Sequence, residues 1–368
     1  MQYLRLLAFC SGLMLLSEHT KAESVVSPDS DLGLTLVSVV SDLPSAWALV
    51  FDSQQNNYVT LRDGRIRVYE PDGQWKDFKL PIDDLYYAGQ GGLLDIKLHP
   101  KFAENGWIYV SYSAGDDQRN TLKLARLKLP KTGQKLETFE PVFTVEPWRD
   151  TPVHYGARIL FTQNGELLLS SGDAFDYREQ AQQLTSHLGK ILRVSDSGHA
   201  DIVSYGHRNP QGLVQTANAT IIAHEHGPDG GDEINIIENN TNYGWPVATY
   251  GKDYIGASIS PFTEYPGMRA PELNWTPSIA PSSMLWYNAQ SYAPSPYANT
   301  LSGLLITTLK TRELTVVQNL SGVWTQTATL FADKHTRWRD IATDQQGYIY
   351  LLSDGEPASI AKVIGRGN

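Results

Sequence analysis

Cysteine is nearly absent from this chain, since Cys10 is the only one among 368 residues. A single cysteine cannot close an internal disulfide or supply a thiolate cluster to a metal, so neither can hold the fold together. Methionine is also scarce, with 4 residues, whereas the 30 glycines and 19 tyrosines favour a structure of strands and turns.

Positive charge is in deficit as well. The 30 lysines and arginines are outnumbered by 40 aspartates and glutamates, which gives a formal charge of −10. The chain therefore lacks the basic surface that nucleic-acid binding requires and a polybasic patch for a membrane. No apolar run is long enough for a membrane helix, so no membrane span is expected. Hydrophobic residues at 41% and charged residues at 19% are typical of a folded domain.

The N-terminus has the pattern of an export signal. Arg5 supplies a short positive region, Leu6–Leu16 is apolar but too short to cross a bilayer, and Thr20-Lys21-Ala22 ends on a small residue. We expect residues 1–22 to be a cleaved signal peptide and residues 23–368 to form one domain of a periplasmic or secreted protein. A buried strand or helix is the alternative interpretation. Cleavage would remove the only cysteine and leave 28 basic against 39 acidic residues.

An apolar run, a polar turn and a second apolar run recur along the chain. In the first copy Trp47–Phe51 leads to Tyr58–Leu61 and then to Arg65–Tyr69. The copies begin near residues 48, 96, 159, 213, 304 and 341. Short apolar runs between Asp, Asn and Gly turns are typical of antiparallel strands. A period of roughly fifty to sixty residues suits one four-stranded blade with its loops.

These recurrences predict an all-β fold, a six-bladed β-propeller. The interval between residues 213 and 304 is the longest, so loop insertions are expected there. A β-sandwich is the alternative, but it would use only about seven to nine strands. In a propeller the loops at one end converge on the central axis, where a small-molecule site is expected.

Six sequence motifs are more specific than turns require. They are Gly89–Asp95, His154–Arg158, Ser204–Gly212, His224–Asn235, Asn242–Pro246 and Arg337–Asp340. In this order they resemble the soluble quinoprotein glucose/aldose sugar dehydrogenase family, from about Leu43 to Val363. The resemblance implies oxidation of an aldose sugar by pyrroloquinoline quinone (PQQ) with Ca²⁺, followed by transfer of electrons to an acceptor that the sequence does not identify.

A histidine and an aspartate flank one predicted strand, Ile159 to Ser170. His154 precedes this strand and Asp173 follows it at a turn. A carboxylate near an imidazole fixes its tautomer and favours its charged form, which makes the histidine a better base. The resemblance implies that His154 takes the proton of the anomeric hydroxyl and that Asp173 orients it. A histidine beside a strand is otherwise usually structural.

The remaining catalytic and cofactor-binding roles also follow from the resemblance. Arg208 would stabilise the reduced quinone oxygen, as a guanidinium with two donors can, and Asn209 would help to hold the cofactor. The other residues that the resemblance assigns to the quinone are Gln90, Lys310, Arg337 and Arg339. Their positive charges suit a cofactor with three carboxylates. The arginines could instead belong to an ordinary solvated strand or pair with surface acids.

Two calcium sites are expected on the same grounds. Gly227 and Pro228 can offer backbone carbonyl oxygens, and the resemblance implies that this pair binds the calcium next to the quinone. Glu233, Tyr243 and Asp253 match a separate structural calcium site. An acidic turn without metal is the alternative at residues 229–233.

Two departures from the family pattern concern the sugar contacts. His226 stands where the glucose enzymes most often carry glutamine, and Trp275 lies one residue earlier than in those enzymes. No dinucleotide fingerprint opens a helix, which disfavours a nicotinamide enzyme. Two rival functions stay open: a calcium-dependent propeller hydrolase of sugar lactones, and a non-catalytic propeller that has lost its cofactor.

Overall fold

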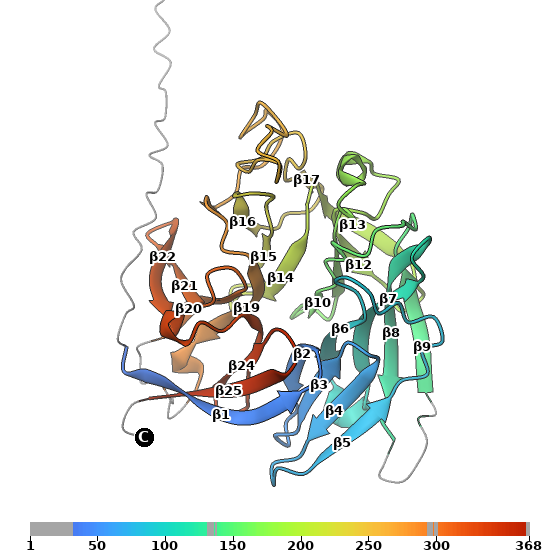
Figure 1. Ribbon diagram of the computed structural model, residues 1–368, viewed down its shortest axis with the longest axis vertical. Coiled ribbons are helices and arrows are strands. Elements are labelled where there is room, and N and C mark those ends of the chain that lie inside the picture. Colours follow the sequence, from blue (N-terminus) through green and yellow to red (C-terminus); the bar gives the residue numbers. More distant parts are fainter. Residues whose placement is uncertain (1–31, 131–135, 137, 293–296, 298–300, 366–368) are drawn as a thin grey trace, which may run out of the picture.

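The computed structural model describes residues 32–130, 136, 138–292, 297 and 301–365. The predicted signal peptide, residues 1–22, lies outside them. Within the described part almost all regular structure is β, and six sheets surround a central axis (Figure 1). The chain is thus a six-bladed β-propeller and not a β-sandwich. The helical turns are α1 (Phe102–Asn105), η1 (Arg178–Gln182), η2 (Ala289–Ser291) and η3 (Ala332–Lys334).

Blades one to three follow one another along the chain. Their strands are β2 (Ala46–Phe51), β3 (Asn57–Leu61), β4 (Arg65–Tyr69) and β5 (Trp75–Lys79); β6 (Leu93–Leu98), β7 (Ile108–Gly115), β8 (Asn120–Lys128) and β9 (Thr138–Thr144); and β10 (Ile159–Phe161), β11 (Leu167–Ser171), β12 (Lys190–Val194) and β13 (Ala200–Tyr205). Each is an antiparallel meander whose first strand is innermost. A short strand, β17 (Thr241–Asn242), adds to the outer edge of blade three in parallel with β13.

Blades four to six complete the ring. Their strands are β14 (Pro210–Gln215), β15 (Ile221–Glu225), β16 (Asp232–Ile236) and β18 (Leu273–Trp275); β19 (Pro281–Asn288), β20 (Ser302–Thr308), β21 (Leu314–Leu320) and β22 (Val323–Leu330); and β23 (Trp338–Thr343), β24 (Ile349–Ser353), β25 (Ala358–Gly365) and β1 (Leu34–Leu43). Because β1 pairs antiparallel with β25, the two ends of the described chain share one blade. This pairing closes the ring.

Two boundaries differ from the sequence prediction. The copy predicted near residue 304 is the second strand of blade five, whose innermost strand, β19, begins at Pro281. The predicted strand from Ile159 to Ser170 is a hairpin of β10 and β11. The expected insertion is confirmed, because residues 237–272 separate β16 from β18 in blade four.

The core lies between adjacent blades. All of β3 and β11, and nearly all of β7 and β20, are buried on both faces. Apolar residues of neighbouring sheets therefore pack face to face, and the largest cluster extends across blades one to three. Such burial on both faces explains why these strands show continuous apolar runs rather than alternation.

A buried arginine links the innermost strands at the axis. Arg158 is 3% exposed, and its Nη1 lies 3.2 Å from Asp95 Oδ1 in blade two and 3.0 Å from Asp340 Oδ1 in blade six. Its Nε donates to the Gln211 carbonyl oxygen in blade four at 2.7 Å, and its guanidinium lies 4.2 Å from the Trp47 ring centre in blade one. Its Nη2 donates to the Ser282 carbonyl oxygen in blade five at 2.8 Å, so one side chain preceding β10 of blade three joins all five other blades.

Two histidines of blade four are held as neutral groups, His224 fully buried and His226 partly buried directly after β15. Burial lowers the pKa of His224 to about 3, and the neighbouring His226 and Arg158 act in the same direction. Burial also lowers the pKa of His226 to about 4. The folded protein therefore leaves both imidazoles unprotonated at mildly acidic pH, where an unfolded chain would protonate them.

Acid should destabilise the fold through these histidines. Below the ordinary histidine pKa of 6.5 the unfolded chain binds protons that the folded chain does not. The free energy of unfolding should therefore decrease as the pH is lowered. The slope is about 1 kcal/mol per pH unit for each histidine. Urea unfolding from neutral pH to about pH 5 should give a smaller slope in His224→Gln. His199→Gln, whose imidazole is 74% exposed, should keep the wild-type slope. Equal slopes in wild type and His224→Gln would contradict this account.

Candidate active site

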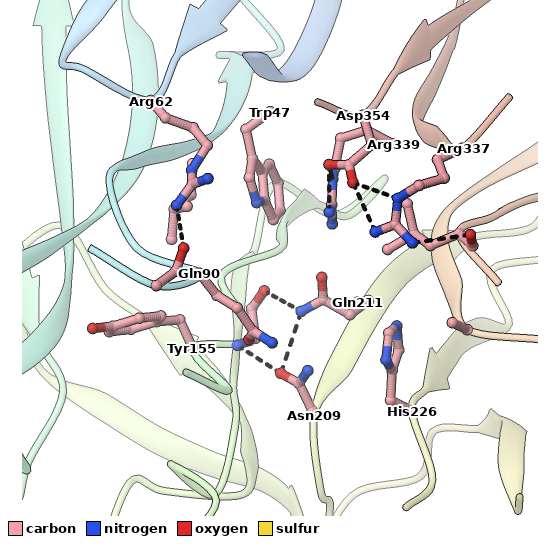
Figure 2. Close-up of a pocket in the computed structure, with 15 residues that line it drawn as sticks. Trp47, Arg62, Gln90, Tyr155, Asn209, Gln211, His226, Arg337, Arg339 and Asp354 are labelled. Carbon is pink, nitrogen blue, oxygen red and sulfur yellow. Dashed lines mark hydrogen bonds and ion pairs between the residues drawn. The ribbon is translucent and has the colours of Figure 1, made fainter. Parts of the chain in front are cut away.

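A pocket of about 340 Å³ opens where the six innermost strands converge. Every blade contributes to its wall, through its innermost strand, the segment before that strand or the loop after its second strand (Figure 2). The lining residues are Trp47, Arg62, Gly89, Gln90, Leu94, Tyr155, Gly156, Asn209, Gln211, His226, Ala280, Leu309, Arg337, Arg339 and Asp354. The volume is within the range of small-molecule sites.

Most predicted site residues lie in or beside this pocket. Four of the residues predicted to bind the cofactor line it, namely Gln90, Asn209, Arg337 and Arg339. The backbone N–H of His154 donates to Gln90 Oε1 at 2.8 Å, and Arg208 directly precedes Asn209. The candidate base therefore adjoins the pocket wall.

His154 and Asp173 form a buried pair. His154 Nδ1 lies 2.7 Å from Asp173 Oδ1, with the histidine side chain 7% exposed and the aspartate side chain fully buried. The carboxylate also accepts hydrogen bonds from Trp245 Nε1 at 2.8 Å and from the Phe175 backbone N–H at 2.8 Å. These donors fix the carboxylate, and the carboxylate fixes the imidazole with Nδ1 protonated.

The hairpin of β10 and β11 explains why the pair meets. If residues 159–170 formed one strand, His154 and Asp173 would lie at opposite ends of the blade. The hairpin reverses the chain and brings both residues to the same end. His154 precedes β10 with a left-handed φ of 53°, and Asp173 follows β11. A Cβ on Gly172 would come within 2.1 Å of the His154 carbonyl oxygen, so this close approach requires glycine.

Burial, not the carboxylate, sets the direction of the histidine pKa. Burial lowers the pKa of His154, and the positive charges of Arg208 and Arg149 add to this effect. The hydrogen bond with Asp173 raises it, but by less. For Asp173 burial opposes ionisation, yet the His154 hydrogen bond and nearby positive charge still hold its pKa below its ordinary value. The resting pair is thus a neutral imidazole on a carboxylate, whereas the sequence predicted a favoured imidazolium.

Arg208 lies near enough to the His154–Asp173 pair for its charge to act on both groups. Its Nη1 donates to the Gly227 carbonyl oxygen at 2.7 Å and to that of His226 at 3.2 Å. The guanidinium also lies 5.4 Å from the centre of the Trp245 ring. Behind it, the Glu225 carboxylate accepts from the Arg208 backbone N–H at 2.5 Å, which holds the loop in place.

Positive charge gathers at one side of the pocket. Arg337 and Arg339 both bind Asp354, at 2.8 Å and 2.7 Å. Arg62 donates to backbone carbonyls from another part of the wall, and burial together with the charge of Arg339 lowers its pKa (Figure 2). The pocket wall therefore carries three arginines and one carboxylate, and two of the arginines pair with it. Lys310 follows a lining residue and is half-exposed.

Two lining residues, Arg62 and Asp354, lie outside the six sequence motifs and were not predicted. Each follows the second strand of its blade, β3 and β24, as Asp173 follows β11 and His226 follows β15. Aligning the copies at this position would have singled out both residues.

Comparisons with known proteins agree with this geometry. Residues 43–362 match the family model described as "Glucose / Sorbosone dehydrogenase". The chain belongs to the glucose/sorbosone dehydrogenase family. The aldose sugar dehydrogenase YliI of Escherichia coli is 34% identical over 354 residues, which cover 90% of this chain and 93% of that protein.

A solved structure and a second curated protein are also similar to this chain. The crystal structure of the soluble aldose sugar dehydrogenase of Escherichia coli in its apo form superimposes with a TM-score of 0.81 at 31% identity, covering 90% of this chain and 100% of that one. The quinoprotein glucose dehydrogenase B of Acinetobacter calcoaceticus is 28% identical over 266 residues, or 61% of this chain and 55% of that protein.

Of the two carbonyl groups expected to bind the calcium next to the quinone, that of Gly227 lies beside Arg208. The Gly227 carbonyl accepts from that arginine, and the Gly227 N–H donates to Asp232 Oδ1 at 2.8 Å. Pro228 follows and has no N–H, so it offers only an acceptor. The carbonyl group of Gly227 thus already faces a positive charge.

The residues expected at the structural calcium site have different partners. Burial and the charge of nearby carboxylates raise the pKa of Glu233, and the buried Asn235 Oδ1 beside it has no hydrogen-bond partner among the described residues. Tyr243 Oη donates to a backbone carbonyl at 2.5 Å, and Asp253 lies 3.9 Å from Arg178. In the part of the chain that the structure describes, no hydrogen bond or ion pair joins the three side chains.

The two departures from the family pattern have different positions. His226 lines the pocket, and its Nε2 donates to the Pro281 carbonyl at 2.8 Å, which leaves Nδ1 as an acceptor. Trp275 is buried and donates to Gln326 Oε1 at 2.8 Å instead of lining the pocket. His226 therefore is the departure that can alter contacts in the pocket.

Proposed function

We propose that this protein oxidises aldose sugars at the anomeric carbon to the lactone, with pyrroloquinoline quinone as the electron acceptor in the pocket. The observation that carries the proposal is the 2.7 Å His154–Asp173 pair beside a pocket rich in arginine. The relatives named as aldose sugar dehydrogenase and quinoprotein glucose dehydrogenase support the same reaction.

The neutral His154 is suited to be the general base. Its Nδ1–H is held by Asp173, and its Nε2 has no hydrogen-bond partner among the described residues, so Nε2 would take the proton of the anomeric hydroxyl. The Asp173 carboxylate would stabilise the imidazolium that forms. Arg208 would place positive charge beside the oxygen that becomes anionic.

The pocket residues fit a quinone that carries three carboxylates. Arg62, Arg337 and Arg339 would bind the carboxylates, and Gln90 and Asn209 would supply neutral polar contacts. Lys310, which follows the lining residue Leu309 and lies 4.0 Å from Asp229, would reach a carboxylate from outside the pocket wall. When bound, the quinone would accept the hydride that leaves the anomeric carbon. Because Arg62 shares the pocket and its pKa responds to Arg339, it belongs to the same anion-binding wall.

The donor sets also fit calcium. The Gly227 and Pro228 carbonyls would be hard oxygen ligands next to the proposed quinone, where a divalent cation would polarise the reacting carbonyl. The Gly227 carbonyl now accepts from Arg208 Nη1, so it would bind the ion only by giving up this partner. At the second site the Glu233 carboxylate and the unpartnered Asn235 Oδ1 would supply oxygen ligands to the ion. Tyr243 and Asp253 would reach that ion only by giving up their present partners.

Export is proposed from the N-terminal pattern, which makes the protein periplasmic or secreted with cleavage near Ala22. No helix in the described part of the chain is long and apolar enough to cross a membrane. The electron acceptor that reoxidises the quinone is a partner of unidentified nature.

Both rival functions are less well supported. A calcium-dependent lactone hydrolase would place several side-chain carboxylates around its metal, but no group of three or more His, Cys, Asp or Glu side chains could hold a metal among the described residues. A propeller that had lost its chemistry would not need to keep the buried His154–Asp173 pair with the positive charge of Arg208 near it.

Reconstitution tests the proposed function. Purified protein supplied with PQQ and Ca²⁺ should reduce an artificial dye when an aldose is added, and should reduce none when the quinone is left out. Chelation of Ca²⁺ should abolish the dye reduction as well. Sugar oxidation that depends on a nicotinamide cofactor and ignores the quinone would overturn the proposal.

A further inference from the structure

Two aromatic rings are exposed next to the candidate base. Phe175 is 42% exposed and Tyr254 is 62% exposed, and their rings lie nearly parallel, 6.3 Å apart at an interplanar angle of 19°. An exposed apolar surface beside a candidate active site is a place where part of a ligand can pack.

Each of the two rings contacts one of the proposed catalytic side chains, His154 or Arg208. The Phe175 ring meets the His154 ring edge to face at 5.2 Å. Tyr254 Oη lies 3.4 Å from Arg208 Nη2, and the guanidinium lies 6.0 Å from the Tyr254 ring centre. The two rings therefore form a ledge that leads outward from the base.

The backbone holds Phe175 in this exposed position against its own preference. Ala174 and Phe175 both have left-handed φ values, 58° and 64°. Asp173 Oδ1 accepts from the Phe175 N–H at 2.8 Å, and Thr151 Oγ1 donates to the Ala174 carbonyl at 2.7 Å. Such strain in bulky residues is characteristic of functional sites. The carboxylate that orients the base thus also positions the ring.

The second ring comes from the insertion in blade four. Tyr254 lies in a tight turn closed by hydrogen bonds from the Gly256 N–H to the Asp253 carbonyl at 2.7 Å and from the Asp253 N–H to the Ala257 carbonyl at 2.8 Å. Arg178 of the blade-three loop lies 3.9 Å from Asp253. The turn is therefore tied to the loop that carries Phe175.

We propose that the Phe175–Tyr254 ledge is an outer sugar subsite, which binds the second ring of a saccharide whose reducing end lies at His154. This inference rests on the proposed function. The C–H face of a pyranose ring packs on an aromatic face while its hydroxyl groups bind polar groups at the edge, and the ledge offers both through its rings and through Tyr254 Oη and Arg208. Because Tyr254 lies one ring beyond Phe175, it contacts the second sugar unit rather than the first.

Tyr254→Ala tests the ledge through the preference for disaccharides. In reconstituted protein the ratio of KM for maltose to KM for glucose should rise five- to tenfold, because only maltose reaches Tyr254. Tyr254→Phe, which keeps the ring, should shift the ratio less than twofold. The matched control is Tyr265→Ala, which disrupts another exposed aromatic pair, Phe262 and Tyr265 at 5.0 Å, and should leave the ratio unchanged.

A binding measurement separates this inference from the proposed reaction. Maltose titrated calorimetrically into protein without quinone should bind five- to tenfold more weakly to Tyr254→Ala than to wild type or Tyr265→Ala. If wild type oxidises aldoses but Tyr254→Ala leaves both the KM ratio and maltose binding unchanged, the ledge is wrong and the reaction stands. If no sugar reduces the quinone, the reaction fails, and the ledge is judged by the titration alone.

Discussion

His154→Ala should lower the rate at which sugar reduces bound quinone by about 10²–10⁴-fold, because a positioned general base contributes a factor of that size. The side chain enters the proposed chemistry through Nε2, whereas its backbone N–H is what contacts Gln90. The variant keeps that backbone contact, so quinone affinity should change little. Single-turnover reduction of bound quinone, followed optically after mixing with sugar, separates the chemical step from turnover of the dye.

The pH dependence distinguishes a base from a contact residue. Only neutral His154 accepts a proton, so the single-turnover rate should rise with pH through the histidine pKa and level off. Burial lowers this pKa below 6.5, so the rise should be complete at a lower pH than for an exposed histidine. A reduction rate in His154→Ala close to that of wild type would end the assignment.

Asp173→Asn should lower the single-turnover rate less than His154→Ala and should also shift its pH dependence. Its carboxylate raises the pKa of His154, so its removal should move the acid limb of the profile to lower pH. The plateau should fall as well, because an amide no longer stabilises the imidazolium. Tyr265→Ala is again the control, and it should reproduce the wild-type profile. A profile in Asp173→Asn that loses rate without moving its acid limb would contradict this role.

The architecture was predictable from the sequence because its signals are local. Apolar runs such as Tyr58–Leu61 and Ile349–Ser353, each next to a short polar turn, mark strands without reference to distant residues. The prediction failed where that signal weakens. The first strand of blade five begins with the polar run Pro281-Ser282-Ser283, which hides its boundary. The sequence pattern therefore predicts the start of this blade near residue 304, in its second strand.

The site was predictable only where its residues lie in motifs. His154, Asn209 and Arg337 lie in conspicuous stretches, and the structure brings all three to the pocket or its rim. Arg62 and Asp354 stand alone in the sequence, and their role depends on blades that meet only after the ring closes. The direction of the His154 pKa was missed for the same reason, since burial by distant segments outweighs its nearby carboxylate.

The double variant Arg337→Ala, Arg339→Ala should bind the quinone at least tenfold more weakly than wild type. Each charge-assisted hydrogen bond contributes about 1.5–3 kcal/mol, so the loss of two exceeds the 1.4 kcal/mol that corresponds to a factor of ten. Both arginines also neutralise Asp354. Because the Asp354 side chain is only 20% exposed, solvent would screen its charge only partly if the arginines were removed. Their removal therefore leaves an unpaired carboxylate facing a tricarboxylate ligand.

Asp354 allows the two causes of this loss to be separated. Replacing it by Asn in the double variant removes the repulsion but restores no arginine contact, so quinone affinity should recover in part and stay below that of wild type. The control for a simple change of net charge is Arg269→Ala, which removes an arginine that is paired with Glu238 and Glu272 and does not line the pocket. Quinone titration of these variants, read by protein fluorescence, measures each affinity without any turnover.

If the double variant bound the quinone as tightly as wild type, both arginines would be excluded from the site. Full recovery on adding Asp354→Asn would instead mean that the arginines act only by neutralising that carboxylate.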